Sequence, residues 1–343
     1  MILRTLGLCA LVAAAPRAIA IETLRSVGGL PAHVAGRFNE LTVCRQLADG
    51  TFLVFDRRSQ TVFSVAPSAD AATPIVTIGA EPGRIIQPYA FDVAGNGVFV
   101  VADAPENRTR VQSFLPSGSR LTGFSLQGRG LPLLIDGVAI TGVASLVLSN
   151  RSIFVSWPET GSLVTEHGLD GISSRTFGEL RPTGHEQDRA LHHALNSGLV
   201  VINPEGGFYY VFVAGVPTFR KYEASGTMVF ERHIEGVELD EYMRTRPTAW
   251  PRRKTGDGEL PVVRPVVRAA AADASGNLWL SLDTAHTYVY DRRGDKQRVV
   301  QFRAAGLVAP TNMSFTSAGR LLVTPGCFLF DAGSASPKPR AAG

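Results

Sequence analysis

The segment Ala269–Phe302, AAAADASGNLWLSLDTAHTYVYDRRGDKQRVVQF, decides the fold of this chain. It contains four short runs of small, β-branched or aromatic residues, which are Ala269–Ala272, Leu278–Leu282, Thr287–Tyr290 and Arg298–Phe302. Clusters of Asp, Gly and Ser separate these runs, and this is the pattern of strands joined by tight turns. The segment therefore predicts an antiparallel meander of four strands.

Six segments of the chain follow the same template, so the sequence contains an internal repeat. In each segment one residue ends the first turn, just before the second strand. These anchor residues are Gly50, Gly97, Asn150, Gly207, Gly276 and Gly319, at spacings of 47, 53, 57, 69 and 43 residues. Gly suits this place because a tight hairpin needs a positive φ angle, and Asn is the best substitute. Repeated meanders of this length are the blades of β-propellers. We therefore predict an all-β, six-bladed β-propeller with four-stranded antiparallel blades.

The last blade has only three recognisable strands before the chain ends. The segment Ile21–Val27, which belongs to no other blade, would supply its fourth strand. An N-terminal strand that pairs with the last blade would close the ring and cover an exposed sheet edge. We predict this closure, with residues 21–333 as a single propeller domain and residues 334–343 as a flexible tail.

The first 20 residues have the features of a secretory signal peptide. Arg4 provides a basic start, Leu6–Ala15 is a short apolar core, and Ala18–Ala20 is an A-x-A cleavage pattern. The apolar core is too short to span a bilayer, and no second run is long enough for a membrane helix. We expect residues 1–20 to be removed and the mature protein to be secreted or periplasmic. A buried first strand is the alternative interpretation.

The composition, with 45% hydrophobic and 19% charged residues in a chain of 343, is that of a globular protein with a large core. Loss of Arg4 and Arg17 with the signal peptide would lower the formal net charge from +4 to +2. The charges are scattered, so nucleic acid is not an expected partner. Cys44 and Cys327 would remain. They would pair only in an oxidising compartment, and both lie in apolar runs where free Cys packs as a small hydrophobe, so we favour unpaired thiols.

The turn and strand pattern resembles that of NHL-type six-bladed β-propellers of the TolB-like/NHL-repeat superfamily. The resemblance is carried by Asp49-Gly50 with Asp56, by Ala94–Gly97 with Asp103, and by Asp273–Gly276 with Asp283. It covers nearly all of the mature chain and implies the propeller fold. Such propellers include binding platforms for proteins, RNA or glycans, and related folds include calcium-dependent lactonases, gluconolactonases and strictosidine-synthase-like enzymes. The fold does not settle which function applies.

The long connections lie on one face of the predicted propeller. They are Gly128–Thr141, Gly178–Gly198 and Ile234–Val267, and all of them lie where the innermost strands begin and the central channel opens. Long loops on a rigid scaffold are common places for binding and catalysis. We expect the ligand site on this long-loop face. The candidate ligand-binding residues are Glu40, Gln87, Tyr89, His192, His193, Asn196, Trp250, Arg268 and Asn312.

A calcium-dependent hydrolase would need several oxygen ligands that converge on one cation. Glu40, Asn196 and Asn312 would supply some of them, but the E-G-P-x-W pattern of the lactonases is absent and Arg268 would repel the ion. The alternative is that these groups bond to inner-strand backbone and to channel water. We therefore predict no metal ligand and no catalytic residue, and calcium belongs only to the alternative function.

Two loop segments carry further candidates. If Gly184–His193 were helical, the side chains of His185, Asp188 and His192 would share one face, and these are residue types that bind zinc. The segment has no H-E-x-x-H spacing, however, so we favour a solvated loop. The segment Leu239–Arg246 predicts one or two helical turns. Trp250 follows it, between Pro-rich and basic residues. This residue would be either the tip of a partner-binding loop or part of a lid whose ring packs on the propeller. We favour the lid.

We expect a monomeric, non-catalytic propeller that binds a protein, peptide or glycan on its long-loop face and needs no cofactor. The alternative is a calcium-dependent lactonase or esterase-type hydrolase with its site at the mouth of the central channel. A purely structural role in a cell-envelope assembly is the third possibility. Three or more converging carboxylates at the innermost strand starts would favour the enzyme, whereas the mixed Asn, His, Arg and Tyr set favours binding.

Overall fold

A computed structural model of the chain describes residues 19–126, 132–135, 138–141, 145–149, 152–255 and 258–333. The predicted signal peptide lies mainly outside these residues. The anchor Asn150 and the predicted tail 334–343 lie wholly outside them. Strands are the main regular structure of the described chain, and the short helices lie in connections. Among the described residues no helix is both long and apolar enough to cross a membrane.

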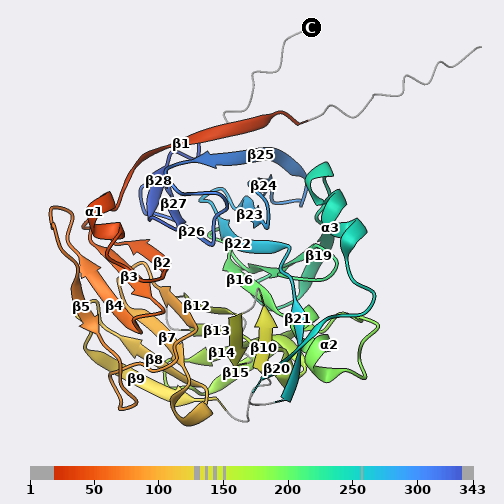
Figure 1. Cartoon of the computed structure of the whole chain (residues 1–343), viewed down its shortest axis with the longest axis horizontal. Helices are drawn as coiled ribbons and strands as arrows, with labels where there is room; N and C mark the ends of the chain where they lie inside the picture. The colour runs from red at the N-terminus through yellow and green to blue at the C-terminus, as the bar shows by residue number, and fades with distance from the viewer. Residues whose placement is uncertain are drawn as a thin grey trace, which may run out of the picture.

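Four sheets each contain four strands that follow one another along the chain and pair antiparallel (Figure 1). The first is β2 (Leu41–Gln46), β3 (Phe52–Asp56), β4 (Thr61–Val65) and β5 (Thr73–Val76), and the second is β6 (Ala90–Val93), β7 (Phe99–Asp103), β8 (Arg110–Phe114) and β9 (Arg120–Ser125). The third is β12 (Ser145–Ser149), β13 (Ser152–Ser156), β14 (Ser162–Gly168) and β15 (Ser173–Glu179), and the fourth is β16 (Gly198–Ile202), β17 (Phe208–Phe212), β18 (Thr218–Tyr222) and β19 (Met228–His233). These sheets are propeller blades, as the repeat predicts.

An eight-stranded sheet brings the two ends of the described chain together, with the order β22-β23-β24-β25-β1-β28-β27-β26. Its strands are β1 (Ile21–Gly29), β22 (Val267–Ala272), β23 (Leu278–Leu282), β24 (Thr287–Tyr290), β25 (Lys296–Arg303), β26 (Asn312–Phe315), β27 (Leu321–Thr324) and β28 (Phe328–Phe330). Near its end, from Ser26 to Gly29, β1 pairs antiparallel with β28, so only the last part of the predicted segment Ile21–Val27 reaches this strand. The start of β1 also pairs in parallel with β25, which was not predicted (Figure 1, red beside blue). β1 therefore links β22–β25 to β26–β28.

A further four-stranded sheet, in the order β11-β10-β21-β20, is built from two long connections. β10 (Pro132–Ile135) and β11 (Val138–Thr141) follow β9, whereas β20 (Arg252–Thr255) and β21 (Gly258–Val263) precede β22. β10 and β21 pair in parallel, so connections that are distant in the sequence meet in space. The sequence predicts that these connections share a face, but not that they form a sheet.

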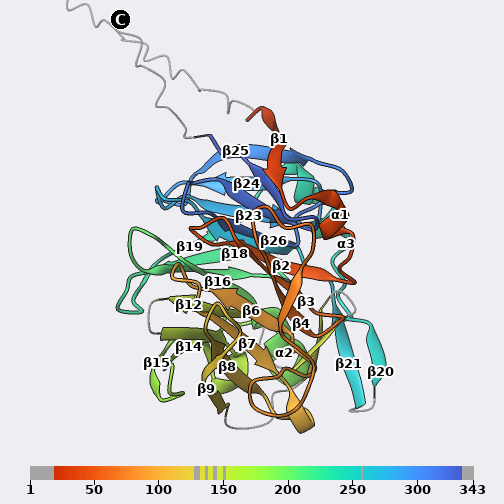
Figure 2. The same cartoon turned by 90° about the vertical axis from the view of Figure 1, so that its left-hand side faces the viewer.

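The helices lie in the connections between strands. They are α1 (Ala32–Ala35), α2 (Arg189–Asn196), α3 (Asp240–Thr245) and the 3-10 turns η1 (Pro105–Asn107), η2 (Pro158–Thr160) and η3 (Val237–Leu239). The pair η3 and α3 confirms the helical turns that the sequence predicts there. Figure 2 shows α1, α3, β20 and β21 on one side of the molecule, which we call the long-loop face.

The repeat also explains how the blades pack. The second strands β3, β7, β17 and β23 are buried along their whole length because neighbouring strands and neighbouring sheets cover them. Between the first two blades, for example, the rings of Phe55 and Phe91 stack with centroids 5.2 Å apart. The anchor glycines of the described chain have φ angles from 73° to 87°, as predicted. At Gly207 a Cβ atom would lie 2.1 Å from the carbonyl oxygen of Tyr222, so Gly is required.

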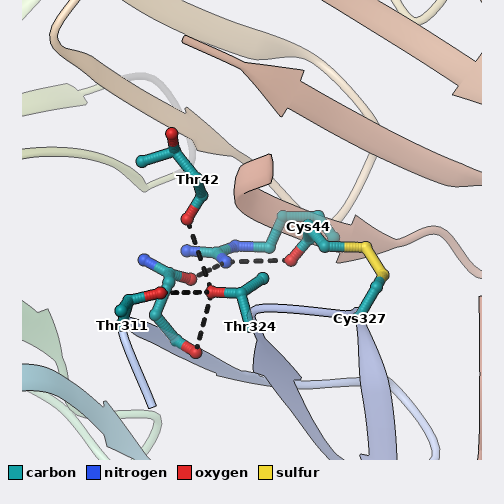
Figure 3. Close-up of a disulfide and its surroundings, with 7 residues drawn as sticks. Thr42, Cys44, Thr311, Thr324 and Cys327 are labelled. Atoms are coloured by element: carbon teal, nitrogen blue, oxygen red, sulfur yellow. Dashed lines mark hydrogen bonds between the residues drawn. A yellow bond between two sulfur atoms is a disulfide. The ribbon is translucent and has the colours of Figure 1, made fainter. Parts of the chain in front are cut away.

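Cys44 of β2 and Cys327, just before β28, form a disulfide (Figure 3), so the prediction of two unpaired thiols is wrong. The two cysteines are 283 residues apart, but their Cα atoms are only 5.8 Å apart, which is within the range of a disulfide. Both residues are buried, and the apolar surroundings that suggested free thiols do not reveal this proximity. The hydroxyl of Thr324 also donates to the carbonyl oxygen of Thr42 at 3.4 Å. The first blade is thus tied to the last strands of the chain.

Candidate functional site

The residues predicted to surround the channel mouth are largely engaged within the fold. Glu40 accepts a hydrogen bond from the guanidinium of Arg57. Arg268 forms an ion pair with Asp283. The backbone N–H of Gln87 donates to Gln60 Oε1 at 2.7 Å, and the half-buried Tyr89 packs against the apolar cluster between the second and third blades. Each of these four candidates thus makes a contact within the fold.

Helix α2 holds three more of the candidates. Asn196 is completely buried, and its side chain bonds to the backbone N–H and C=O of Arg181 at 2.8 and 3.1 Å. His193 is buried with its Nδ1 3.9 Å from Oε1 of Glu159. The Nδ1 of His192 lies 2.8 Å from the Thr183 hydroxyl. Asn196 thus fastens the end of the helix to the chain segment that precedes it.

Asp188 explains why the helix begins where it does. It is the N-cap of α2, and its carboxylate accepts a hydrogen bond from the backbone N–H of Leu191 at 3.2 Å. The same carboxylate forms an ion pair with Arg252 of β20. The helix does not begin until Arg189, so His185 lies outside it. The zinc site considered for His185, Asp188 and His192 required one helix that contains all three residues. Of these, α2 contains only His192.

The pKa of His192 gives a test of how α2 is packed. Burial lowers this pKa below its ordinary value of 6.5, although the nearby Glu186 acts in the opposite direction. The unfolded state therefore holds more protons just below pH 6.5, so the free energy of unfolding falls as the pH falls through that window. In urea titrations at about pH 7.5 and 5.5, we expect a smaller fall for His192→Gln than for the unaltered protein. An equal fall would show that His192 does not contribute.

The central channel has an apolar wall with one polar crossing. A cavity of about 510 Å³ is lined by residues of the innermost strands β2, β6, β12, β16, β22 and β26 and by the tight turns that follow them. Arg45 of β2 crosses it, donating to Asn312 Oδ1 at 2.6 Å and to Asp92 Oδ1 at 3.1 Å. Asp92 also accepts from the backbone N–H of Leu148 at 3.0 Å. Asn312, a predicted ligand residue, is therefore part of a brace that connects β2, β6, β12 and β26.

A second cavity of about 590 Å³ lies on the long-loop face over β18 and β19, and we call it the blade-four cavity. Its walls come from the segment before α2, the turn before β18, and the segment around α3. The chemically distinctive lining residues are Arg181, His185, Arg220, Met243, Arg246 and Trp250. Cationic, aromatic and thioether side chains thus surround one cavity.

Arg181 is the most constrained cation of the blade-four cavity. Its guanidinium donates to the carbonyl oxygens of Val216, Leu195 and Ala214 at 2.7, 2.8 and 2.5 Å, and it lies 4.0 Å from the ring centroid of Phe212. Burial lowers the pKa of Arg181 to about 10, which still leaves it charged at neutral pH. These acceptors are neutral carbonyl oxygens, which hold the guanidinium in place without cancelling its charge. A buried cation of this kind favours an anionic neighbour.

Arg220, by contrast, is paired within the cavity wall. Its Nε donates to Oε2 of Glu231 at 2.5 Å, and its Nη1 donates to the carbonyl oxygen of Glu179 at 2.6 Å. Arg246, at the end of α3, is exposed. The three arginines and the one carboxylate of Glu231 leave a formal charge of +2 on the lining. The blade-four cavity is therefore suited to an anionic group.

Trp250 connects the blade-four cavity to the fold. It is half-buried against a cluster that contains Leu195, Val213, Ala214 and Val263. The ring therefore packs on the propeller, as the lid interpretation predicts, and it also lines the cavity. Of the nine predicted ligand residues, Trp250 is the one that lines the blade-four cavity.

Arg181, Arg220 and Arg246 were not among the residues that the sequence predicts for a site. Arg220 gave no clear signal, because it stands beside Lys221 in the strand Thr218–Tyr222, TFRKY. Arg181 and Arg246 lie in connections between strands. The sequence does not show where such connections run in three dimensions. In the part of the chain that the structure describes, no group of three or more His, Cys, Asp and Glu side chains is placed to hold a metal ion.

Comparison with known proteins supports the fold. No protein-family model and no curated protein matches the sequence. A streptogramin B lyase structure is 11% identical with a TM-score of 0.52, over 84% of this chain and 76% of that one. A gluconolactonase of Xanthomonas campestris is 15% identical with a TM-score of 0.51, over 92% and 98%. A virginiamycin B lyase from Staphylococcus aureus is 10% identical with a TM-score of 0.51, over 85% and 79%. The resemblance to NHL-type propellers is thus confirmed at the level of architecture, and this chain has the β-propeller fold of these lyases and this gluconolactonase.

Proposed function

We propose that this chain is a binding β-propeller and that a peptide or a segment of another protein occupies the blade-four cavity. The observation that carries the proposal is the lining of this cavity. Its volume of about 590 Å³ is in the range of ligand pockets. Trp250 and the three arginines belong to the residue types that dominate binding energy at protein interfaces, and Met243 adapts to apolar groups.

The proposal includes a ring of six blades. The strands β22–β25 would form the fifth blade, and β26–β28 with β1 would form the sixth. Two observations support this count. The innermost strands of all six units line one channel, and an apolar cluster that includes Val54 and Leu322 connects the first unit to the last.

The proposal also includes a secreted or periplasmic protein whose residues 1–20 are a signal peptide. The disulfide between Cys44 and Cys327 supports this, because disulfides persist in oxidising compartments. A monomer remains our expectation.

The contacts at the channel mouth favour binding over hydrolysis. The oxygens that would serve a calcium ion are those of Glu40, Asn196 and Asn312. Each of them already accepts a hydrogen bond, from Arg57, from the Arg181 backbone and from Arg45 respectively. A cation there would have to compete with two guanidinium groups.

Filling the blade-four cavity tests the proposal. Val216 lines the cavity and is 37% exposed, so Val216→Trp adds a large ring without disturbing the core. Peptides would first be selected from a phage-displayed random library on the immobilised full chain. We expect Val216→Trp to lower their affinity about tenfold or more in calorimetric titrations, because the ring occupies the space that the ligand needs.

The matched control is Val308→Trp, which adds the same ring at an exposed position outside the cavity lining. The affinity of this variant for the selected peptides should stay within about twofold of that of the unaltered protein, as for ordinary surface substitutions. If Val216→Trp unfolds at a lower temperature than the unaltered protein, Thr248→Trp serves as a second variant that fills the cavity. Equal binding by the cavity and control variants would overturn the proposed site. Calcium-dependent hydrolysis of a lactone by the unaltered protein would overturn the non-catalytic assignment.

A further inference from the structure

β20 is an edge strand whose outer side faces no other strand in the described chain. It is last in the order β11-β10-β21-β20 and pairs with β21 alone. Arg252, Arg253 and Lys254 of this strand are all exposed. Figure 2 shows β20 on the outer side of β21, at the rim of the long-loop face. An edge of this kind presents backbone groups that another extended chain can pair with.

The register shows which backbone groups point outward. The N–H of Val262 donates to the carbonyl oxygen of Pro251 at 2.8 Å, so these two residues form a hydrogen-bonded pair. Bonded and non-bonded pairs alternate along antiparallel strands. Arg252 and Lys254 therefore direct their N–H and C=O groups to the free edge. The residue opposite Arg252 is Pro261, which has no N–H. It could not donate to Arg252, and this agrees with a non-bonded pair at that position.

The charges beside this edge determine what kind of strand would fit it. The Arg252 side chain pairs with Asp188, but the side chains of Arg253 and Lys254 have no hydrogen-bond or ion-pair partner among the described residues. A second copy of β20 would place like charges opposite one another, which is destabilising. An acidic strand would place carboxylates beside these cations instead. The segment that precedes β20 contains Trp250, so such a strand would lie next to the blade-four cavity.

We propose that the partner of this propeller is an extended acidic peptide segment that adds as a strand to the free edge of β20 and places a carboxylate in the blade-four cavity. The inference rests on the proposed function and names the class of ligand. Main-chain hydrogen bonds to Arg252 and Lys254 would supply affinity, as in other cases of strand addition. Arg253, Lys254 and the Arg181 guanidinium would supply the preference for acidic side chains. Nucleic acid and lipid surfaces share the charge but have no peptide backbone to pair with this edge.

Two substitutions of Lys254 separate the backbone contribution from the charge. Lys254→Pro removes the outward N–H and the charge but breaks no bond to β21, whereas Lys254→Gln removes only the charge. The probe is a twelve-residue peptide of alternating Glu and Thr, compared with its Lys and Thr counterpart and with a form N-methylated along one edge. We expect affinity to fall about tenfold or more with Lys254→Pro or with N-methylation, and only about threefold with Lys254→Gln.

The outcomes distinguish this inference from the proposed function. Equal losses for Lys254→Pro and Lys254→Gln would show that charge alone acts, and this would overturn strand addition. If library-selected peptides are sensitive to Val216→Trp but not to Lys254→Pro, the cavity remains the site and only the β20 inference falls. Tighter binding of the Lys and Thr peptide, of duplex DNA or of vesicles with anionic lipid than of the Glu and Thr peptide would also overturn it. Slower hydrogen exchange of the Lys254 amide when the Glu and Thr peptide binds would support it.

Discussion

Replacing both Cys44 and Cys327 by alanine lowers the free energy of unfolding by about 2–5 kcal/mol, because the disulfide closes a loop that contains most of the chain. The bond restricts the unfolded chain far more than a local crosslink would, since its cysteines are 283 residues apart. It also joins β2 to the residue just before β28, so its loss removes a link between the first blade and the last strands. Urea unfolding followed by tryptophan fluorescence measures the change.

Chemical reduction provides the control for this prediction. Both cysteines are buried, so the alanine variant also loses packing around two sulfur atoms. Reduced protein with its natural cysteines keeps these atoms and isolates the effect of the bond. The alanine variant should not respond to the reductant at all. If reduced and oxidised proteins unfold at the same urea concentration, the disulfide does not stabilise the fold.

Replacing Arg45 by methionine lowers the free energy of unfolding by about 3 kcal/mol, because it leaves the carboxylate of Asp92 without its counter-charge in a mostly apolar channel. The side chains of Arg45 and Asp92 are only 17% and 11% exposed, so water replaces little of the lost interaction. Met fills a similar length of channel without a charge. The same urea experiment measures the loss.

The matched control for Arg45 combines Arg45→Met with Asp92→Asn. This pair removes both charges, and the amide oxygen that the second substitution introduces can still accept from the N–H of Leu148. The double variant should recover about half or more of the loss, since breaking one partner of a buried pair costs more than removing both. If the single and double variants are equally unstable, the brace acts through packing and not through charge.

The blades were predictable because their signals are local. The strands Leu278–Leu282 and Thr287–Tyr290 occupy the residues that the sequence predicts, since short apolar runs bounded by Asp and Gly turns specify strands without help from distant residues. The five anchor glycines of the described chain are likewise demanded by the turns themselves. The missing strand of the last blade predicts a place for Ile21–Val27 beside β28, but Ile21 to Arg25 pair with β25 and only the end of β1 reaches β28.

The rest of the fold depends on contacts between distant segments. Predicting the disulfide would have required knowing that β2 lies close to the turn before β28, and no spacing in the sequence indicates this. The sheet β11-β10-β21-β20 joins two connections through a parallel pairing in which, among the described residues, Leu134 lies opposite Val262 and Ile135 opposite Val263. Each connection forms its own hairpin, but nothing in either hairpin indicates that it pairs with the other.

The candidate site was predictable only in outline. The sequence located the long connections and Trp250, and the blade-four cavity lies among them. The repeat indicates roughly where a residue lies along an innermost strand, but not what its side chain contacts. Asn196 is an example, because its polar groups are satisfied by the backbone of Arg181 and His192. The position of Arg181 in the cavity depends on the turn before β18, which supplies the carbonyl oxygens that hold it.

The position of β1 has a consequence for how the protein is made. β1 leaves the ribosome well before its partners β25 and β28, because most of the described chain lies between them. Each intermediate length of nascent chain therefore carries an N-terminal strand without a partner and blades with an uncovered flank. Such surfaces aggregate readily, and contacts between distant segments form slowly. Chaperone occupancy on the growing polypeptide should accordingly persist until β28 has emerged, and ribosome-bound chains truncated before Phe328 should remain sensitive to protease.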